Sequence, residues 1–219
     1  MRTLTHRPRA QREDLGLDAR AFAQLAALTS PQHVQAFVNA IPANFEPDGE
    51  TVRSVSGVLQ HRKAHCIEGA MVAACALWIH GDPPLLMHLD CAIGDYPHVV
   101  ALFKRGRHWG AVSKSNHAVL RFRDPVYRSL RELTMSYLHE FRDSDGHKTL
   151  RSFSAPFDLR RVAVREWVTG GASCWELHDQ LAARRHFPLM TATQARGLVD
   201  ADACEREAAL VVDFAPPVV

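Results

Sequence analysis

Residues 61–81 read HRKAHCIEGAMVAACALWIHG, and this stretch decides the fold that the chain is expected to adopt. A charged segment ends at Cys66, and the apolar run that follows is typical of a helix buried in a hydrophobic core. Free cysteine is often a buried packing residue. A cysteine at a helix N-terminus, however, is also well placed to lose its proton. The stretch therefore leaves two interpretations of Cys66 open: a structural thiol or a nucleophile.

The residues that precede Cys66 favour the nucleophile. His61, Arg62, Lys63 and His65 are cationic or can become so. Positive charge beside a thiol stabilises the thiolate, as does the positive end of the helix dipole. The combination is typical of a partly exposed, electropositive cysteine.

The composition is that of an ordinary globular protein. The chain has 219 residues, of which 47% are hydrophobic and 23% charged, so one domain with a substantial core is expected over residues 1–219. The net charge is +2 and the basic residues are dispersed, which argues against a nucleic-acid partner. The longest apolar run, from Gly69 to Ile79, is shorter than the ~20 residues that cross a bilayer, so no membrane partner is expected.

The five cysteines are odd in number, and none of them forms a C-x-x-C pair. The first residues are basic and polar and show no apolar region of a secretory signal. These features predict reduced thiols in a cytoplasmic protein.

The first half of the chain predicts helices followed by strands. Residues 1–14 are expected to form a flexible arm, and helical spacing begins at residue 17 and restarts at Pro31. After a loop, apolar spacing in 51–63 predicts a helix that could lead directly into the Cys66 helix. Residues 85–93 predict a half-buried strand, and 98–113 predict two strands joined by a tight turn at Gly106.

The second half is expected to complete the domain mainly with helices, over residues 126–219. Amphipathic spacing predicts helices in 124–141, 173–187 and 192–212, with an extended segment in 150–162. The order of elements is α+β and lacks the regular alternation of a Rossmann-type sheet.

A thiolate nucleophile needs a base, and the base needs a group that orients it. His98 begins the first predicted strand of the hairpin, where it can face the helix N-terminus. Centring the hairpin on KRGR places Ser113 roughly opposite His98, with Asn116 just beyond and Asp124 on the next segment. A neutral Asn or Ser can orient an imidazole, although without the electrostatic support of a carboxylate.

These residues together resemble the core of transglutaminase-like cysteine enzymes. The resemblance rests on Cys66 at a helix start in H-C-x-E-G-A, a strand opening H-V at His98, and a paired strand containing Trp109, and it covers residues 51–125. Relatives of that core include arylamine N-acetyltransferases and peptide N-glycanases. The resemblance implies a bacterial-type transglutaminase-like domain with a papain-like core. In such a core the nucleophile helix packs on a small antiparallel sheet flanked by additional helices, with Cys66 as nucleophile and His98 as base.

The third position departs from the family pattern. In that family an aspartate, often followed by proline, comes soon after the tryptophan of the second strand. Here the sequence reads WGAVSKSNHAVLRFRDP, so Ser113 or Lys114 occupies the expected place and the Asp-Pro pair is delayed to Asp124. We expect Asn116 to orient the histidine, with Asp124 as its rival; an incomplete triad is the third alternative.

Two further features concern the chemistry of the site. Gln60, six residues before Cys66, has a side-chain amide that would help a backbone N–H form an oxyanion hole, although a polar residue at a helix end needs no such role. The thirteen histidines lack H-E-x-x-H or paired-cysteine spacing, so neither a metal nor another cofactor is expected.

The sequence supports two functional hypotheses. The first is a transglutaminase-like cysteine hydrolase or acyltransferase that acts on an amide or carboxamide through the Cys66–His98 pair. Its substrate is a protein, a peptide or a small-molecule amide, and the pattern discriminates neither among these nor among oligomeric states. The alternative is a non-catalytic binding or scaffold protein on the same fold.

Overall fold

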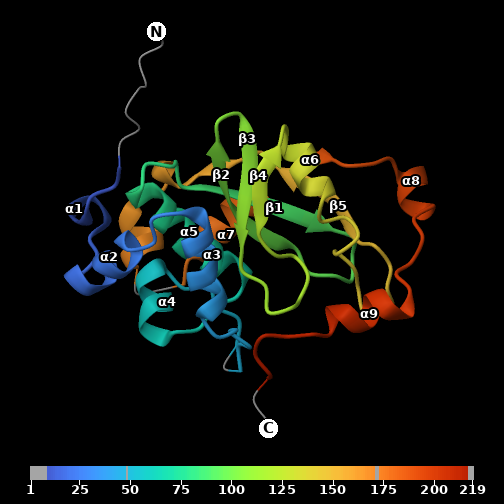
Figure 1. Ribbon diagram of the computed structural model, residues 1–219, viewed down its shortest axis with the longest axis horizontal. Helices are drawn as coiled ribbons and strands as arrows, with labels where there is room; N and C mark the ends of the chain where they lie inside the picture. The colour runs from blue at the N-terminus through green and yellow to red at the C-terminus, as the bar shows by residue number, and fades with distance from the viewer. Residues whose placement is uncertain (1–8, 48, 171–172, 217–219) are drawn as a thin grey trace.

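The computed structural model describes residues 9–47, 49–170 and 173–216, and these form a mixed α+β structure built on a seven-stranded sheet (Figure 1). The strands run in the order β4-β3-β2-β1-β5-β7, with β6 paired to β1 outside this path. They are β1 Leu85–Cys91, β2 His98–Arg105, β3 His108–Ser113, β4 Arg123–Tyr127, β5 Leu150–Ser154, β6 Phe157–Asp158 and β7 His186–Pro188. The α-helices are α1 Arg12–Leu15, α2 Ala19–Ala26, α3 Pro31–Ala40, α4 Val55–His61, α5 Cys66–Ile79, α6 Leu130–Met135, α7 Trp175–Ala182, α8 Ala192–Arg196 and α9 Ala203–Ala209, and a 3₁₀ turn, η1 Leu159–Arg161, and a π-helical turn, η2 Arg165–Thr169, complete the elements.

The α+β class predicted from the sequence is confirmed, and the assigned strand pairs are antiparallel. The predicted hairpin is also confirmed. Arg105 pairs with His108, so Gly106 and Arg107 form a two-residue turn, and Gly106 takes a positive φ of 60°. Such turns need left-handed backbone, which glycine adopts without steric cost.

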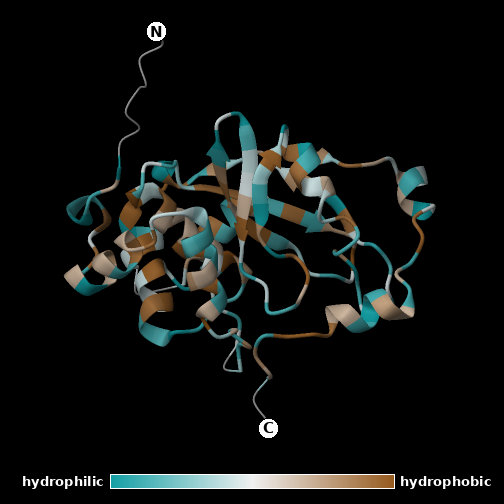
Figure 2. Ribbon diagram, in the orientation of Figure 1, coloured by the Kyte–Doolittle hydropathy of each residue, from teal (hydrophilic) through white to brown (hydrophobic). Residues whose placement is uncertain are grey.

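Helix α5 lies between the sheet and the N-terminal helices. Nearly all of its residues from Ile67 to Ile79 are buried, as expected for a helix that is apolar on every side. Alternate strand residues divide between two hydrophobic clusters: Val99 and Ala101 pack on the α5 side, whereas Val100 and Leu102 face the α6 side. In Figure 2 hydrophobic residues gather where helices meet the sheet, while α8 is mainly hydrophilic.

Helices α4 and α5 are separate and do not form one continuous helix. Arg62 takes the left-handed conformation (φ 54°, ψ 39°) at the C-terminus of α4. The next residues then run extended, and Ala64 forms a bridge with Ala43. Because of this break, α5 starts at Cys66 as a new helix and does not continue the axis of α4.

The C-terminal region is less helical than predicted. It supplies β5, β6 and β7 as well as helices, because the extended segment after residue 150 pairs with β1. The helix expected from residue 124 begins only at Leu130, since residues 123–127 form the edge strand β4, where Pro125 is tolerated. The helix expected over 192–212 is split into α8 and α9.

The N-terminal arm predicted from the sequence is only partly described by the structure. Of the arm expected over 1–14, residues 1–8 lie outside the described residues. The remainder is attached to the core, because Ala10 is buried and donates its N–H to the carbonyl of Trp78.

Among the described residues, no helix combines the length and apolar character needed to cross a membrane.

Candidate active site

Cys66 is the first residue of α5, and the helix start is built around it. His65 precedes it as the N-cap residue in extended conformation, and the first intrahelical hydrogen bond runs from the Gly69 N–H to the His65 carbonyl. The N–H groups of the first turn therefore point away from the helix without intrahelical partners. They give the Cys66 thiol the positive end of the helix dipole.

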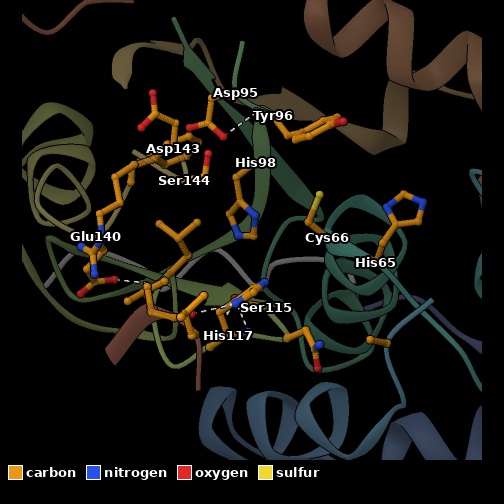
Figure 3. Close-up of a pocket in the computed structure, with 18 of the residues that line it drawn as sticks. His65, Cys66, Asp95, Tyr96, His98, Ser115, His117, Glu140, Asp143 and Ser144 are labelled. Carbon is orange, nitrogen blue, oxygen red and sulfur yellow. Dashed lines mark hydrogen bonds between the residues drawn. The ribbon is translucent and has the colours of Figure 1, made fainter. Parts of the chain in front are cut away.

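Cys66 and His98 line one cavity of about 760 Å³. Figure 3 shows the Cys66 side chain between the imidazole rings of His98 and His65. Cys66 is half-buried, whereas His98, the first residue of β2, is only 6% exposed. The predicted nucleophile and the predicted base thus come together, from helix and strand respectively.

The surroundings of Cys66 favour the thiolate. Burial by itself raises the pKa of the thiol, but hydrogen bonds and positive charge from His65 and His98 outweigh burial and lower the pKa from 9.0 to about 5. Cys75 gives the contrast, since burial in the core raises the pKa of that thiol to about 12. All five cysteines are free, as expected.

Ser113 is the residue that contacts the far side of the His98 ring. Its Oγ lies 2.7 Å from His98 Nε2, and the serine is completely buried. The hydroxyl donates its only proton to the carbonyl of Leu120, 2.5 Å away, so Oγ accepts from Nε2–H. A neutral His98 therefore carries its proton on Nε2 and keeps the lone pair of Nδ1 for a proton transfer.

The register of the hairpin explains this contact. Ser113 lies opposite Val100, two residues from the position opposite His98 that the sequence suggested. Because side chains alternate with a period of two, Ser113 and His98 still share one face of the sheet.

Gln35 of α3 holds Ser113 in place. Its side chain accepts the Ser113 N–H at 2.9 Å and donates to the Ser113 carbonyl at 2.8 Å. The sequence reasoning missed this residue, which lies 78 positions from Ser113. A helical glutamine carries no local signal of such a role.

The two residues predicted for the third position lie elsewhere. Asn116 donates to the Phe214 carbonyl and accepts the Phe214 N–H, both at 3.0 Å, so its amide fixes the C-terminal segment instead of His98. Asp124 is exposed on the edge strand β4 and does not line the cavity of Cys66. The structure places Ser113 where the sequence suggested Asn116.

Gln60 also lies away from the predicted position. It is exposed on α4 and lines a different cavity, because the left-handed turn at Arg62 separates its helix from Cys66. Gln60 therefore does not lie beside Cys66, where the sequence suggested that its amide would help form an oxyanion hole.

Lys114 shares the cavity but turns toward α5. It is almost fully buried, and its Nζ donates to the carbonyl of Ile41 at 2.5 Å. Burial lowers the pKa of this amine to about 8. Of the two residues at the position where the family has aspartate, Ser113 contacts His98, and Lys114 packs beside Gly69.

No protein-family model matches the chain, and no curated protein is significantly similar to it. Within residues 9–47, 49–170 and 173–216, no group of three or more His, Cys, Asp or Glu side chains is placed to hold a metal ion. The functional interpretation therefore rests on the geometry around Cys66.

Proposed function

We propose that this protein is a cysteine hydrolase or acyltransferase of the transglutaminase-like kind, acting on an amide or carboxamide. The observation that carries the proposal is the pairing of Cys66, at the start of α5, with a buried His98 whose far nitrogen is anchored by Ser113. A nucleophile helix packed on the antiparallel strands β1, β2 and β3 is consistent with a papain-like core.

The arrangement supports the following reaction. The Cys66 thiol gives its proton to His98 Nδ1, and the sulfur attacks the carbonyl carbon of the substrate. Backbone N–H groups of the first turn of α5 stabilise the oxyanion. When the carbon–nitrogen bond breaks, His98 returns the proton to the leaving amine, and a thioester remains on Cys66. Water or an acceptor amine then attacks the thioester and regenerates the thiol.

The role of Ser113 in this reaction is to orient His98 without adding a charge. It accepts Nε2–H and so fixes the tautomer that leaves Nδ1 as the base. A carboxylate would also stabilise the imidazolium electrostatically, whereas a hydroxyl gives only a hydrogen bond. This neutral third residue is the one observation that favours the alternative, a binding or scaffold protein on the same fold.

Alkylation of the thiols tests the proposal. In the full-length protein, iodoacetamide at pH 6.5 is expected to label Cys66 at least about tenfold faster than the exposed Cys204, because a much larger fraction of Cys66 is thiolate. Cys66→Ala should remove this rapid phase and Cys204→Ala should keep it. Labelling of Cys66 no faster than that of Cys204 would contradict an activated nucleophile.

Turnover provides the second arm of the test. A panel of activated amides, esters and glutamine-containing peptides should yield an acyl-enzyme detectable by mass spectrometry on Cys66. The Cys66→Ala protein should give none while it retains the circular-dichroism spectrum of the parent. A protein that labels rapidly but never acylates would favour the binding function.

A further inference from the structure

His65 lies on the side of Cys66 opposite His98 and has its own set of partners. Its Nε2 lies 2.7 Å from the carbonyl oxygen of Thr51 and 3.6 Å from a carboxylate oxygen of each of Glu46 and Glu68. A carbonyl and carboxylates only accept hydrogen bonds, so Nε2 carries a proton. Figure 3 shows the Cys66 side chain beside this ring, so a positive charge on His65 faces the thiol.

The backbone around His65 fixes this geometry. The Ala64 carbonyl accepts the N–H of Asn44, and the Ala64 N–H donates to the carbonyl of Pro42. The His65 N–H donates to the side chain of Glu68 at 3.1 Å. The loop that carries Glu46 and Thr51 is thereby attached directly to the residue before Cys66.

Glu68 is held firmly as a charged partner. It is completely buried, and its oxygens accept hydrogen bonds from the Arg53 N–H at 2.8 Å and from the Thr51 hydroxyl at 3.0 Å. Arg53 Nη1 lies 3.5 Å from the same carboxylate. A carboxylate held this close favours a positive charge on a neighbouring imidazole.

The charged groups facing His65 come from two parts of the chain: Glu46 and Arg53 from the segment before α4, and Glu68 and Cys66 from α5. Burial alone would lower the pKa of His65. The hydrogen bond and the charge of Cys66, with the charge of Glu68, outweigh burial and raise the pKa to about 9.

The other basic residues before Cys66 do not share this role. His61, Arg62 and Lys63 are exposed at the end of α4, where water and salt screen their charges. Of the four cationic residues in the sequence that suggested an electropositive cysteine, His65 is the one whose charge lowers the pKa of the thiol.

We propose that His65 is a positioning residue that stays protonated through the reaction and stabilises the Cys66 thiolate with its positive charge, while His98 alone exchanges protons with the substrate. This inference rests on the proposed function for its catalytic meaning. It explains how the site works although the residue that orients His98, Ser113, is neutral. The carboxylates of Glu46 and Glu68, which support a charged imidazole, contact His65 instead of His98. The positive charge on His65 stabilises the Cys66 thiolate before it attacks the substrate, and again when Cys66 leaves the thioester as a thiolate.

The test measures the rate of Cys66 alkylation by iodoacetamide between pH 4.5 and 10. In His65→Gln the midpoint of this profile should move up by at least one pH unit from about pH 5, which lowers the rate at pH 5 by about fivefold or more. The rate should recover at pH 10, because the thiol then ionises without help. The matched control is His61→Gln, which changes an exposed imidazole four residues away and should leave the profile in place.

A second variant keeps the test valid if His65→Gln folds poorly. Glu46→Gln removes one carboxylate but retains an oxygen for the Thr51 N–H, and it should move the midpoint in the same direction by a smaller amount. In ¹⁵N-histidine NMR spectra of the wild type, one imidazole should remain doubly protonated at pH 8 and should vanish in His65→Gln. A neutral His65 at pH 8, or an unchanged His65→Gln profile, would overturn the inference.

The failure of this inference can be distinguished from the failure of the proposed function. The alkylation and NMR measurements need no substrate, so they report on His65 whether or not an acyl-enzyme forms. A shifted His65→Gln profile without any acylation of Cys66 would support the role of His65 and contradict the proposed enzymatic function. Acylation with an unshifted profile would do the reverse.

Discussion

His98 Nε2 and Ser113 Oγ lie 2.7 Å apart, and both side chains are buried. The serine hydroxyl donates a hydrogen bond to the Leu120 carbonyl, so the three groups form a short hydrogen-bonded chain that fixes the tautomer of His98. The last acceptor of these hydrogen bonds is the backbone carbonyl of Leu120, which lies in the loop after β3. Leu120 has a positive φ of 58°. The orientation of the proposed base thus depends on a neutral hydroxyl.

Ser113→Ala should weaken the site without removing the nucleophile. It leaves the buried Nε2–H of His98 without its acceptor, at a cost of about 1–3 kcal/mol in the free energy of unfolding. If about 1.4 kcal/mol of that loss falls on the transition state, the rate of acylation drops roughly tenfold. Urea unfolding and acylation kinetics measure the two effects.

Ser113→Thr is the matched control, because it retains the hydroxyl and should preserve most of the acylation rate if the methyl group is accommodated. A Ser113→Ala protein with unchanged acylation kinetics would show that His98 does not depend on this hydrogen bond.

Asn116→Ala should affect the C-terminal segment and leave the chemistry largely intact. The Asn116 amide makes two hydrogen bonds with the backbone of Phe214. Losing them should increase amide hydrogen exchange at residues 213–214. The midpoint of the pH profile for Cys66 alkylation should stay within about 0.3 pH units of the wild type, because Asn116 does not contact His98. Such a shift corresponds to about 0.4 kcal/mol. A large loss of Cys66 reactivity would instead restore Asn116 as the residue that orients His98.

Local patterns explain what the sequence predicted correctly. The change from charged to apolar residues at Cys66 marks the start of a buried helix, and Gly106 marks the turn of the hairpin. Both signals lie within a few residues of the feature they specify. The α+β class follows from the same signals, because it depends only on the order of such elements.

The third residue of the site could not be predicted in the same way. Choosing between Ser113 and Asn116 required knowing where the strand ends: Ser113 is the last residue of β3 and shares a face of the sheet with His98, whereas Asn116 lies beyond the strand. Register depends on the turn and on tertiary packing. Here Gln35, from a distant helix, holds the Ser113 backbone, and nothing near Ser113 in the sequence indicates this contact.

The role of His65 was hidden for a related reason. The sequence showed four cationic residues before Cys66 but could not show which of them the chain turns toward the thiol. That depends on the left-handed turn at Arg62 and on the loop that brings Thr51 and Glu46 to the imidazole. Long-range loop contacts of this kind have no periodicity that a sequence pattern can reveal.

Gly69→Ala should destabilise the protein, although alanine is usually the better helix former. A Cβ at Gly69 would lie 2.4 Å from the Cβ of Lys114, an atom fixed to the strand end. The helix and β3 would have to move apart, which we expect to cost about 1–3 kcal/mol of unfolding free energy. The rate of Cys66 labelling should fall as well. A shift of Lys114 would also displace Ser113, the preceding residue, which orients His98.

Gly197→Ala is the control for this substitution. Its Cβ would meet no atom closer than 3.7 Å, so its urea midpoint should remain close to that of the wild type. A Gly69→Ala protein that is as stable as the parent would mean that the close approach of α5 to Lys114 does not constrain the site.

The contact between buried His88 and half-buried His186 predicts a loss of stability in acid. His88 Nδ1 lies 3.0 Å from His186 Nε2, and His186 Nδ1 donates to the Arg184 carbonyl, so His88 is the donor within the pair. Burial, reinforced by the charge of His186, lowers the pKa of His88 from 6.5 to about 4. The folded protein therefore resists protonation of His88, whereas the unfolded chain does not.

The sign of the pH effect follows from this difference. As the pH falls from about 6.5 to about 4, the unfolded state takes up a proton that the folded state refuses, and stability declines by up to about 3 kcal/mol. Urea unfolding at pH 7 and pH 4.5 should show a smaller acid loss in His88→Gln than in the wild type. The exposed His108→Gln should lose as much stability as the wild type. Equal acid losses in the wild type and His88→Gln would show that this pair does not govern the acid stability of the fold.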